Sequence, residues 1–335
     1  ELISSCSPIE SIPNGIMFSF LKIKRMNYIY NFFYQSYKII YLYFKYFILT
    51  FYKELNYETY IYSRSIITSF FLSRIKNLNH IFEAHGKEKN KLLQKMQNSI
   101  IKNNNVKIVY ISESLRRIYG DKSNSLAVLH DSSPYYKKKE SNYFSLKNKY
   151  DPREDKRIKI VYSGSSGEGR GIDLIFALAD LLKDYSFIIL SDLDQRKLPD
   201  NIYNLGYQKH FDVLKILKET DFALMPYQDN LKIGNQNINS LEWMSPLKMF
   251  DYMNTRTAII TSYFPVLEEV IKDLDTGYFV YDYSNPEAWA KVLLNEIKNE
   301  NKRYKTIAEK AKILFDKNYP YQLRSKKIIN LYESF

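Results

Sequence analysis

Cysteine and histidine are scarce in this sequence, which has one cysteine and four histidines among its 335 residues. A single cysteine, Cys6, cannot form an internal disulfide or a thiolate metal cluster, and it is typical of a protein from a reducing compartment. The histidines lie far apart and show no metal-ligand spacing such as His-Glu-x-x-His. We therefore expect no metal site built from the chain's own residues.

Long uncharged apolar runs are also missing. A membrane-spanning helix needs about 18 or more nearly uncharged apolar residues. The stretch 16–55 is rich in Phe, Tyr and Ile, but lysines and an arginine interrupt it. It fits amphipathic helices packed on a sheet, and it also fits a basic, aromatic face resting on an anionic membrane. We expect a cytoplasmic protein, and peripheral attachment to the inner face of the plasma membrane stays open.

Acidic residues are outnumbered by basic ones, 37 against 49, which gives a formal net charge of +12. An anionic partner is therefore expected, and nucleic acid, a nucleotide and an acidic membrane all qualify. The lysines are spread along the chain, and no recognised nucleic-acid motif accompanies them. We therefore expect no nucleic-acid partner.

Glycine is rare as well, yet four of the ten glycines lie within eight residues, at Gly164, Gly167, Gly169 and Gly171. This cluster stands where an apolar strand is predicted to run into an amphipathic helix. Glycines allow a close backbone approach to a ligand, and the first N–H groups of a following helix favour an anion. Arg170 adds a positive charge. The pattern predicts a phosphate site, although a plain strand-to-helix turn would also use glycines.

Apolar runs of strand length alternate with helical stretches along most of the chain, which predicts α/β domains with parallel sheets. A polar, charged stretch separates two such series. We expect an N-terminal domain 1–140, a linker 141–156, a C-terminal domain 157–320 and a last helix 321–335 that packs back on the first domain. The chain starts without methionine, at residues that read as the end of a strand, so we expect the first strand, loop and helix to be missing.

A second informative stretch runs from Trp243 to Met253. Pro246 suits a first helical turn and Ser245 could cap it. Lys248 and Asp251 lie three residues apart, nearly on one helical face, so an ammonium and a carboxylate are predicted to point toward one ligand. A diphosphate flanked by a diol would suit this pair, whereas solvated surface charges are the alternative.

These two stretches, together with Glu83 to Gly86, resemble the retaining GT-B glycosyltransferases of family four, of the glycosyl transferases group 1 type. The resemblance covers most of the chain, with three motifs in the family's order. It implies two facing Rossmann-like, doubly wound parallel-sheet domains. The first would be the acceptor side, and the second would bind the nucleotide sugar.

The resemblance also implies roles for single residues. Arg170 and Lys248 would contact the donor diphosphate, and His85 would lie near the sugar and the acceptor, although it could be an ordinary loop histidine. Asp251 would hold the ribose hydroxyls. Trp243 replaces the family's first acidic residue, and the adjacent Glu242 is the candidate to substitute for it. The remaining expected donor contacts are Gly164, Ser165, Gly169, Gly171, Ser245, Pro246 and Leu247.

The implied activity is transfer of a hexose, with retention and without metal, from a UDP- or GDP-type sugar to a saccharide or lipid-linked acceptor. No other cofactor is expected. Bacterial envelope polysaccharide biosynthesis is the expected setting. Two alternatives stay open, a nucleotide-sugar epimerase and a non-catalytic GT-B-like binding subunit. An epimerase would act without an acceptor, whereas a binding subunit would turn over no donor.

Overall fold

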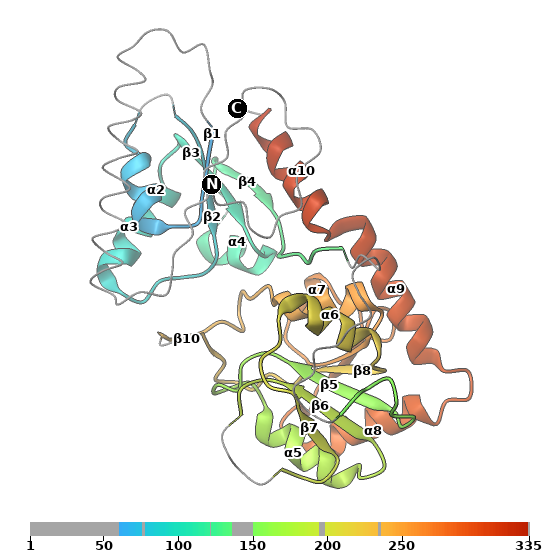
Figure 1. The fold of residues 1–335 in the computed structure, drawn as a ribbon. Coiled ribbons are helices and arrows are strands. Elements are labelled where there is room, and N and C mark those ends of the chain that lie inside the picture. The colour runs from blue at the N-terminus through green and yellow to red at the C-terminus, as the bar shows by residue number, and fades with distance from the viewer. Residues whose placement is uncertain are drawn as a thin grey trace. The chain divides into compact units, whose positions relative to one another are not determined.

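Two compact units make up the part of the chain that the computed structural model describes, residues 60–75, 78–120, 122–135, 150–193, 198–233 and 236–333 (Figure 1). The first unit comprises Glu1–Leu129 with Ser325–Phe335, and the second comprises His130–Arg324. The start of the chain and the stretch 16–55, for which we made separate predictions, lie outside the described residues. Within the described ranges, no helix is both long and apolar enough to span a bilayer.

The first unit is built on a parallel four-stranded sheet with the strand order β1-β2-β3-β4. Polar side chains cap three of its helices: Ser65, Asn90 and Ser112 each accept hydrogen bonds from backbone N–H groups of the first turn. In chain order, the elements before the second unit are β1 (Tyr60–Ser63), α2 (Ile66–Leu72), β2 (Asn79–Ala84), α3 (Lys91–Ile101), β3 (Val106–Tyr110), α4 (Glu113–Tyr119) and β4 (Ser125–Val128).

The second unit contains a parallel six-stranded sheet with the order β12-β11-β8-β5-β6-β7 and a separate antiparallel pair, β9 and β10. Its elements are β5 (Lys159–Ser163), α5 (Ile172–Leu181), β6 (Ser186–Leu190), β7 (Ile202–Asn204), α6 (His210–Lys218), β8 (Phe222–Met225), β9 (Lys232–Ile233), β10 (Gln236–Asn239), α7 (Leu247–Thr255), β11 (Ala258–Ser262), η1 (Leu267–Glu269), β12 (Tyr278–Val280), α8 (Pro286–Ile297) and α9 (Arg303–Asn318).

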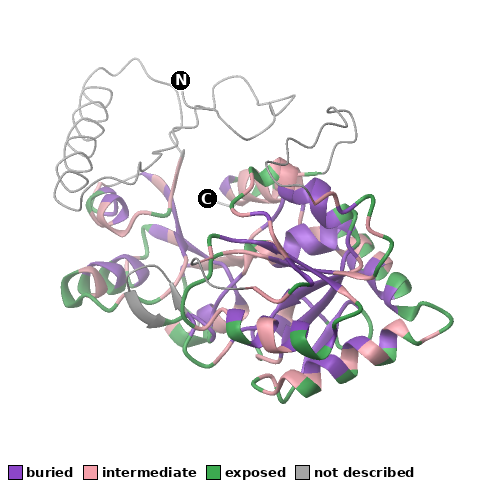
Figure 2. Ribbon diagram, turned by 60° about the horizontal axis from the view of Figure 1, so that its bottom comes forward, coloured by how far each residue is buried: buried purple, intermediate pink, exposed green. Residues whose placement is uncertain are grey.

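Helices cover both faces of the six-stranded sheet. Neighbouring residues of a strand point to opposite sides, and apolar side chains on both sides of this sheet are buried against helices. On β5, Val161 joins the core formed with α6 and α7, whereas Ile160 and Tyr162 join the core formed with α5 and α8. Most strand residues of this sheet are buried (Figure 2). The second unit is therefore doubly wound, and ligands of such sheets bind at the carboxyl edge of the strands.

The chain passes between the units twice, at Leu129/His130 and within α10 (Tyr321–Tyr332). The end of α10 packs on the first sheet, where Tyr332 meets Ile81 and Val109. The first crossing lies about ten residues before the expected end of the N-terminal domain at 140, because the segment after Leu129 bonds to the second unit. Of the expected linker 141–156, the part up to 149 lies outside the described residues. Its remainder packs on the second unit through Tyr150, which stacks on Tyr203.

Candidate functional site

The glycine-rich loop joins β5 to α5 at the carboxyl edge of the second sheet. Gly171 is the N-cap of α5, with φ at 70°. A Cβ atom at this position would lie 2.1 Å from the carbonyl oxygen of Pro226, so only glycine fits there. The Gly169 carbonyl accepts a hydrogen bond of 3.0 Å from the N–H of Gln228. The loop is therefore fixed against the residues that follow β8. The first turn of α5, whose N–H groups have no partner within the helix, begins just after it.

Lys248, the second residue of α7, reaches this loop. Its Nζ lies 2.8 Å from the position that a Cβ on Gly164 would occupy, so the missing side chain makes room for the ammonium. The same Nζ is 4.1 Å from the ring centroid of Tyr162 and 5.2 Å from that of Tyr227. Both distances are within the range of cation–π contacts. The lysine is thus held by the ring of Tyr162 on β5 and the ring of Tyr227, two residues beyond the neighbouring strand β8.

Arg170 lies beside one of these rings, with its Cζ 5.9 Å from the ring centroid of Tyr227. Among the buried polar atoms that form no hydrogen bond in the described part of the chain are three at this loop: Nε of Arg170, Nζ of Lys248 and the hydroxyl of Tyr227. Burial and the Arg170 charge hold the pKa of Lys248 well below its usual range. Burial also raises the pKa of Tyr227 to about 12, against the opposite effect of Arg170. An anion would satisfy all three atoms.

The start of α7 differs from the sequence-based prediction. Pro246 is the N-cap and Leu247 the first helical residue, and no side chain caps the helix. Ser245 was expected as the cap, but its hydroxyl accepts a hydrogen bond of 2.8 Å from the N–H of Asp131, because the segment after Leu129 runs beside it. The Met249 N–H bonds to the Pro246 carbonyl. Within the described ranges, the N–H groups of Leu247 and Lys248 are thus the donors of this helix start that can meet a ligand.

Asp251 lies on α7 but contacts different neighbours from Lys248. Its carboxylate accepts a hydrogen bond of 2.6 Å from the Ser133 hydroxyl, and its two oxygens lie 3.0 Å from Nε2 of His210. The hydrogen bond to Asp251 raises the pKa of His210, whereas partial burial acts in the opposite direction. Sequence analysis assigned no role to Ser133 and His210, since they lie 118 and 41 residues from Asp251 along the chain.

Ser165, Glu242 and Trp243 occupy contrasting positions. Ser165 is exposed, and its carbonyl accepts a hydrogen bond of 2.6 Å from the Tyr162 hydroxyl. Glu242 is exposed, whereas Trp243 is buried with 7% of its surface accessible. The residue at the family's first acidic position therefore packs in the interior, and the neighbouring carboxylate is open to solvent.

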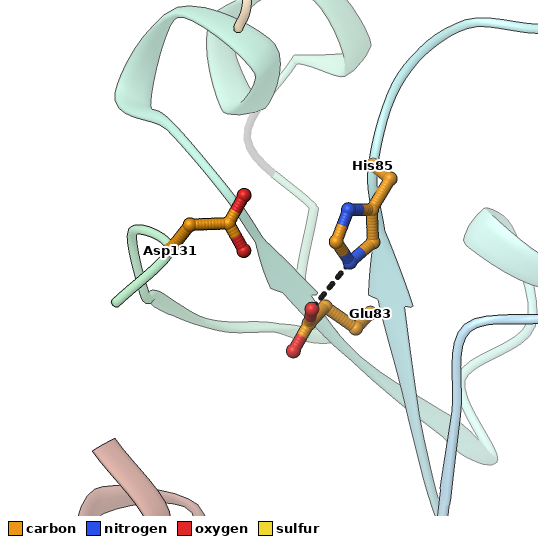
Figure 3. Close-up of side chains that lie close together, drawn as sticks. All are labelled: Glu83, His85 and Asp131. Carbon is orange, nitrogen blue, oxygen red and sulfur yellow. Dashed lines mark hydrogen bonds and ion pairs between the residues drawn. The ribbon is translucent and has the colours of Figure 1, made fainter. Parts of the chain in front are cut away.

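In the first unit, His85 follows the carboxyl end of β2 and interacts through Nε2 with the carboxylate of Glu83 (Figure 3). Glu83 is fully buried, and Arg64 reaches it with an N–O distance of 2.7 Å. His85 keeps about a third of its side chain accessible. The buried carboxylate orients the imidazole, and the exposed ring edge can meet a ligand.

The structure therefore brings Gly164, Arg170 and Lys248 together in the second unit. Glycines 169 and 171 shape the same loop. The sequence analysis missed Tyr162 and Tyr227 as members of this site. A usable signal existed, because both residues stand at or next to the carboxyl ends of strands, where side chains of a parallel sheet converge.

The comparisons with known proteins agree with this architecture. Residues 146–313, half of the chain, match the family of glycosyl transferases group 1, and the chain belongs to this family. Spore coat protein SA of Bacillus subtilis (strain 168) is 21% identical over 183 residues, which cover 52% of this chain and 48% of that protein. The chain thus spans about half the length of the curated relative that it matches.

Two solved structures show the fold. Sucrose-phosphate synthase of Thermosynechococcus elongatus has a TM-score of 0.64 at 12% identity, with 86% of this chain and 76% of that chain covered. HepE of Anabaena, solved in complex with UDP-glucose, has a TM-score of 0.61 at 10% identity, with 83% and 79% covered. The GT-B fold expected from the sequence is confirmed.

Proposed function

We propose that this protein is a glycosyltransferase that moves a sugar from a UDP- or GDP-type nucleotide-diphosphate sugar to a saccharide or lipid-linked acceptor. The reaction retains the anomeric configuration and uses no metal ion. We place it in bacterial envelope polysaccharide biosynthesis, at the cytoplasmic side. Attachment to a membrane surface rests on the basic, aromatic sequence of 16–55 alone.

One observation carries the proposal: the two cations Arg170 and Lys248 meet at the glycine-rich loop without a carboxylate partner. Neither has an ion pair within the described ranges. Both residues are partly exposed, but Nε of Arg170 and Nζ of Lys248 are buried atoms. Buried cationic groups are normally paired, so their counter-charge is expected from a ligand. Their position at the carboxyl edge of a doubly wound sheet, beside the start of α5 and α7, fits a diphosphate.

The chemistry follows from this arrangement. Breaking the bond between the sugar and the diphosphate develops negative charge on the leaving phosphate. Arg170, Lys248 and the first N–H groups of the two helices stabilise this charge in place, without a metal. Within the proposal, Asp251 holds the ribose, Glu242 contacts the transferred sugar, and His85 acts at the sugar or the acceptor.

Two comparisons support the substrate and the setting. HepE, a structural neighbour, was solved with UDP-glucose, which favours a nucleotide-sugar donor. The relative in Bacillus subtilis is named spore coat protein SA, and this name favours a role at the cell envelope.

Calorimetric titration with UDP, GDP and ADP in the presence of EDTA tests the donor site. We expect one nucleotide to bind the wild type, and both Arg170→Ala and Asp251→Ala to weaken its binding at least tenfold. Arg153→Ala is the matched control, because Arg153 pairs with Asp151 at the surface of the same unit. A folded wild type that binds none of the three nucleotides overturns the donor assignment and favours a binding subunit.

Turnover separates the remaining alternatives. With donor and acceptor present, we expect nucleotide release and a product whose anomeric configuration, read by NMR, equals that of the donor. Arg170→Ala should lower turnover about a hundredfold or more. His85→Ala should lower turnover while leaving nucleotide affinity unchanged. An isomeric sugar nucleotide formed from donor alone would instead identify an epimerase.

A further inference from the structure

Lys248 is held by aromatic rings, whereas an ordinary ion-paired lysine is held by a carboxylate. Its ammonium contacts the rings of Tyr162 and Tyr227, at 4.1 and 5.2 Å from their centroids. A lysine bound to a carboxylate would have to break that pair before it could bind an anion. Aromatic faces attract the ammonium without removing its charge. The two tyrosine rings thus position Lys248 and leave its three N–H donors available for an anion.

Tyr227 differs from the other tyrosines at this loop in what its hydroxyl contacts. The Tyr162 hydroxyl donates to the Ser165 carbonyl at 2.6 Å, and the Tyr252 hydroxyl accepts from the Ser163 N–H at 3.0 Å. Tyr227 is 1% exposed. Its hydroxyl interacts with the nearby Arg170 side chain but forms no hydrogen bond of good geometry in the described part of the chain. A buried hydroxyl without a partner is rare in folded proteins and calls for an explanation. A ligand is the simplest one, since Lys248 Nζ and Arg170 Cζ lie 5.2 and 5.9 Å from the centroid of the same ring.

We propose that Tyr227 donates a hydrogen bond to the donor diphosphate and that the rings of Tyr162 and Tyr227 position the Lys248 ammonium for the same diphosphate. The proposal rests on the proposed function, because the ligand is the diphosphate of the donor. It adds Tyr227 as a binding residue and Tyr162 as a positioning residue.

A proton should accompany this binding. In the free protein, burial and the neighbouring Arg170 charge disfavour the ammonium form of Lys248. The other titratable groups in contact with it, Tyr162 and Tyr227, have pKa values raised by burial and stay neutral, so they supply no negative charge. A bound diphosphate supplies that charge and favours the ammonium form. Part of the Lys248 population is therefore expected to take up a proton when the diphosphate binds.

The test uses two probes, the nucleoside diphosphate that binds the wild type most tightly and inorganic pyrophosphate. Tyr227→Phe keeps the ring and removes only the hydroxyl. We expect it to lower the affinity for both probes about tenfold to a hundredfold, the range for the loss of a hydrogen bond to a charged group. Tyr304→Phe is the matched control. It removes a buried hydroxyl that contacts Asp221 near the amino end of β8, at the opposite edge of the sheet.

Calorimetry at pH 8 in two buffers of different ionisation enthalpy measures the proton. We expect proton uptake by the wild type, and none by Lys248→Met. Tyr162→Leu, which removes one ring, should weaken pyrophosphate while the circular dichroism spectrum stays that of the wild type. Unchanged affinity in Tyr227→Phe, or binding of the wild type without proton uptake, overturns this inference and leaves the proposed function standing. If the wild type binds none of the nucleotides and no pyrophosphate, both this inference and the proposed function are overturned.

Discussion

Replacing Gly164 with alanine should disable the proposed phosphate site while leaving the fold in place. The new Cβ would lie 2.8 Å from Nζ and 3.2 Å from Cε of Lys248, and 3.3 Å from the Tyr162 hydroxyl. The nearest atoms belong to the flexible end of a lysine, so this side chain can move and the backbone can stay. The ammonium must then leave its place between the rings of Tyr162 and Tyr227.

The structure also sets the cost in stability. Gly164 has φ at 150°, a conformation that side chains rarely adopt, and strain of this kind costs about 1–3 kcal/mol. For a unit of this size, each kcal/mol lowers Tm by about 2–4 °C. Gly164→Ala should therefore melt a few degrees below the wild type. Loss of one positioned cation should lower the affinity for UDP, or for whichever nucleotide the wild type prefers, about tenfold or more.

Gly167→Ala is the matched control in the same loop. A Cβ at Gly167 would meet no atom within 4 Å, and its φ is not in the left-handed region. We expect wild-type affinity and an equal or slightly higher Tm for this variant. Calorimetric affinity and thermal melting of both variants test the reasoning. The reasoning is refuted if folded Gly164→Ala binds the nucleotide as tightly as Gly167→Ala.

Three further predictions concern single positions. Gly171→Ala should unfold the second unit or lower its free energy of unfolding by about 3 kcal/mol or more, since the Cβ meets a backbone oxygen; a Tm loss below that of Gly164→Ala would contradict this. His210→Asn should lower the free energy of unfolding by about 0.2–1 kcal/mol at pH 5.5, because the imidazole of the pair is half exposed to solvent. The Asp251 contact raises the pKa of His210, so the charged pair stabilises the fold at low pH and this stabilisation is lost as the pH rises through that pKa. If His210→Asn lowered the free energy of unfolding as much at pH 9 as at pH 5.5, the pairing would be contradicted. Glu83→Gln should lower the free energy of unfolding, measured with urea, by about 1.5–3 kcal/mol. Glu113→Gln is the control and should lower it by under about 1 kcal/mol, because its pair with Arg116 is exposed. Equal losses in the two variants would disprove the role of burial.

Much of the fold was predictable because its signals are local. Strand-length apolar runs and intervening helices gave the two parallel sheets, and they placed the glycine-rich loop between β5 and α5. The helix that carries Lys248 was also predicted, since Pro246 marks its start. Its cap was not, because the partner of Ser245 is Asp131, a residue 114 positions away.

The sequence by itself was enough to predict a phosphate site at a glycine loop beside Arg170, because backbone freedom, helix N–H groups and charge are properties of one short segment. Only the tertiary structure decided what surrounds Lys248 and Asp251. The rings of Tyr162 and Tyr227 come from β5 and the end of β8, which are neighbours in the sheet but far apart in sequence. Whether a charged side chain finds a carboxylate, an aromatic face or no partner depends on which strands pair, and no short stretch of sequence contains that information.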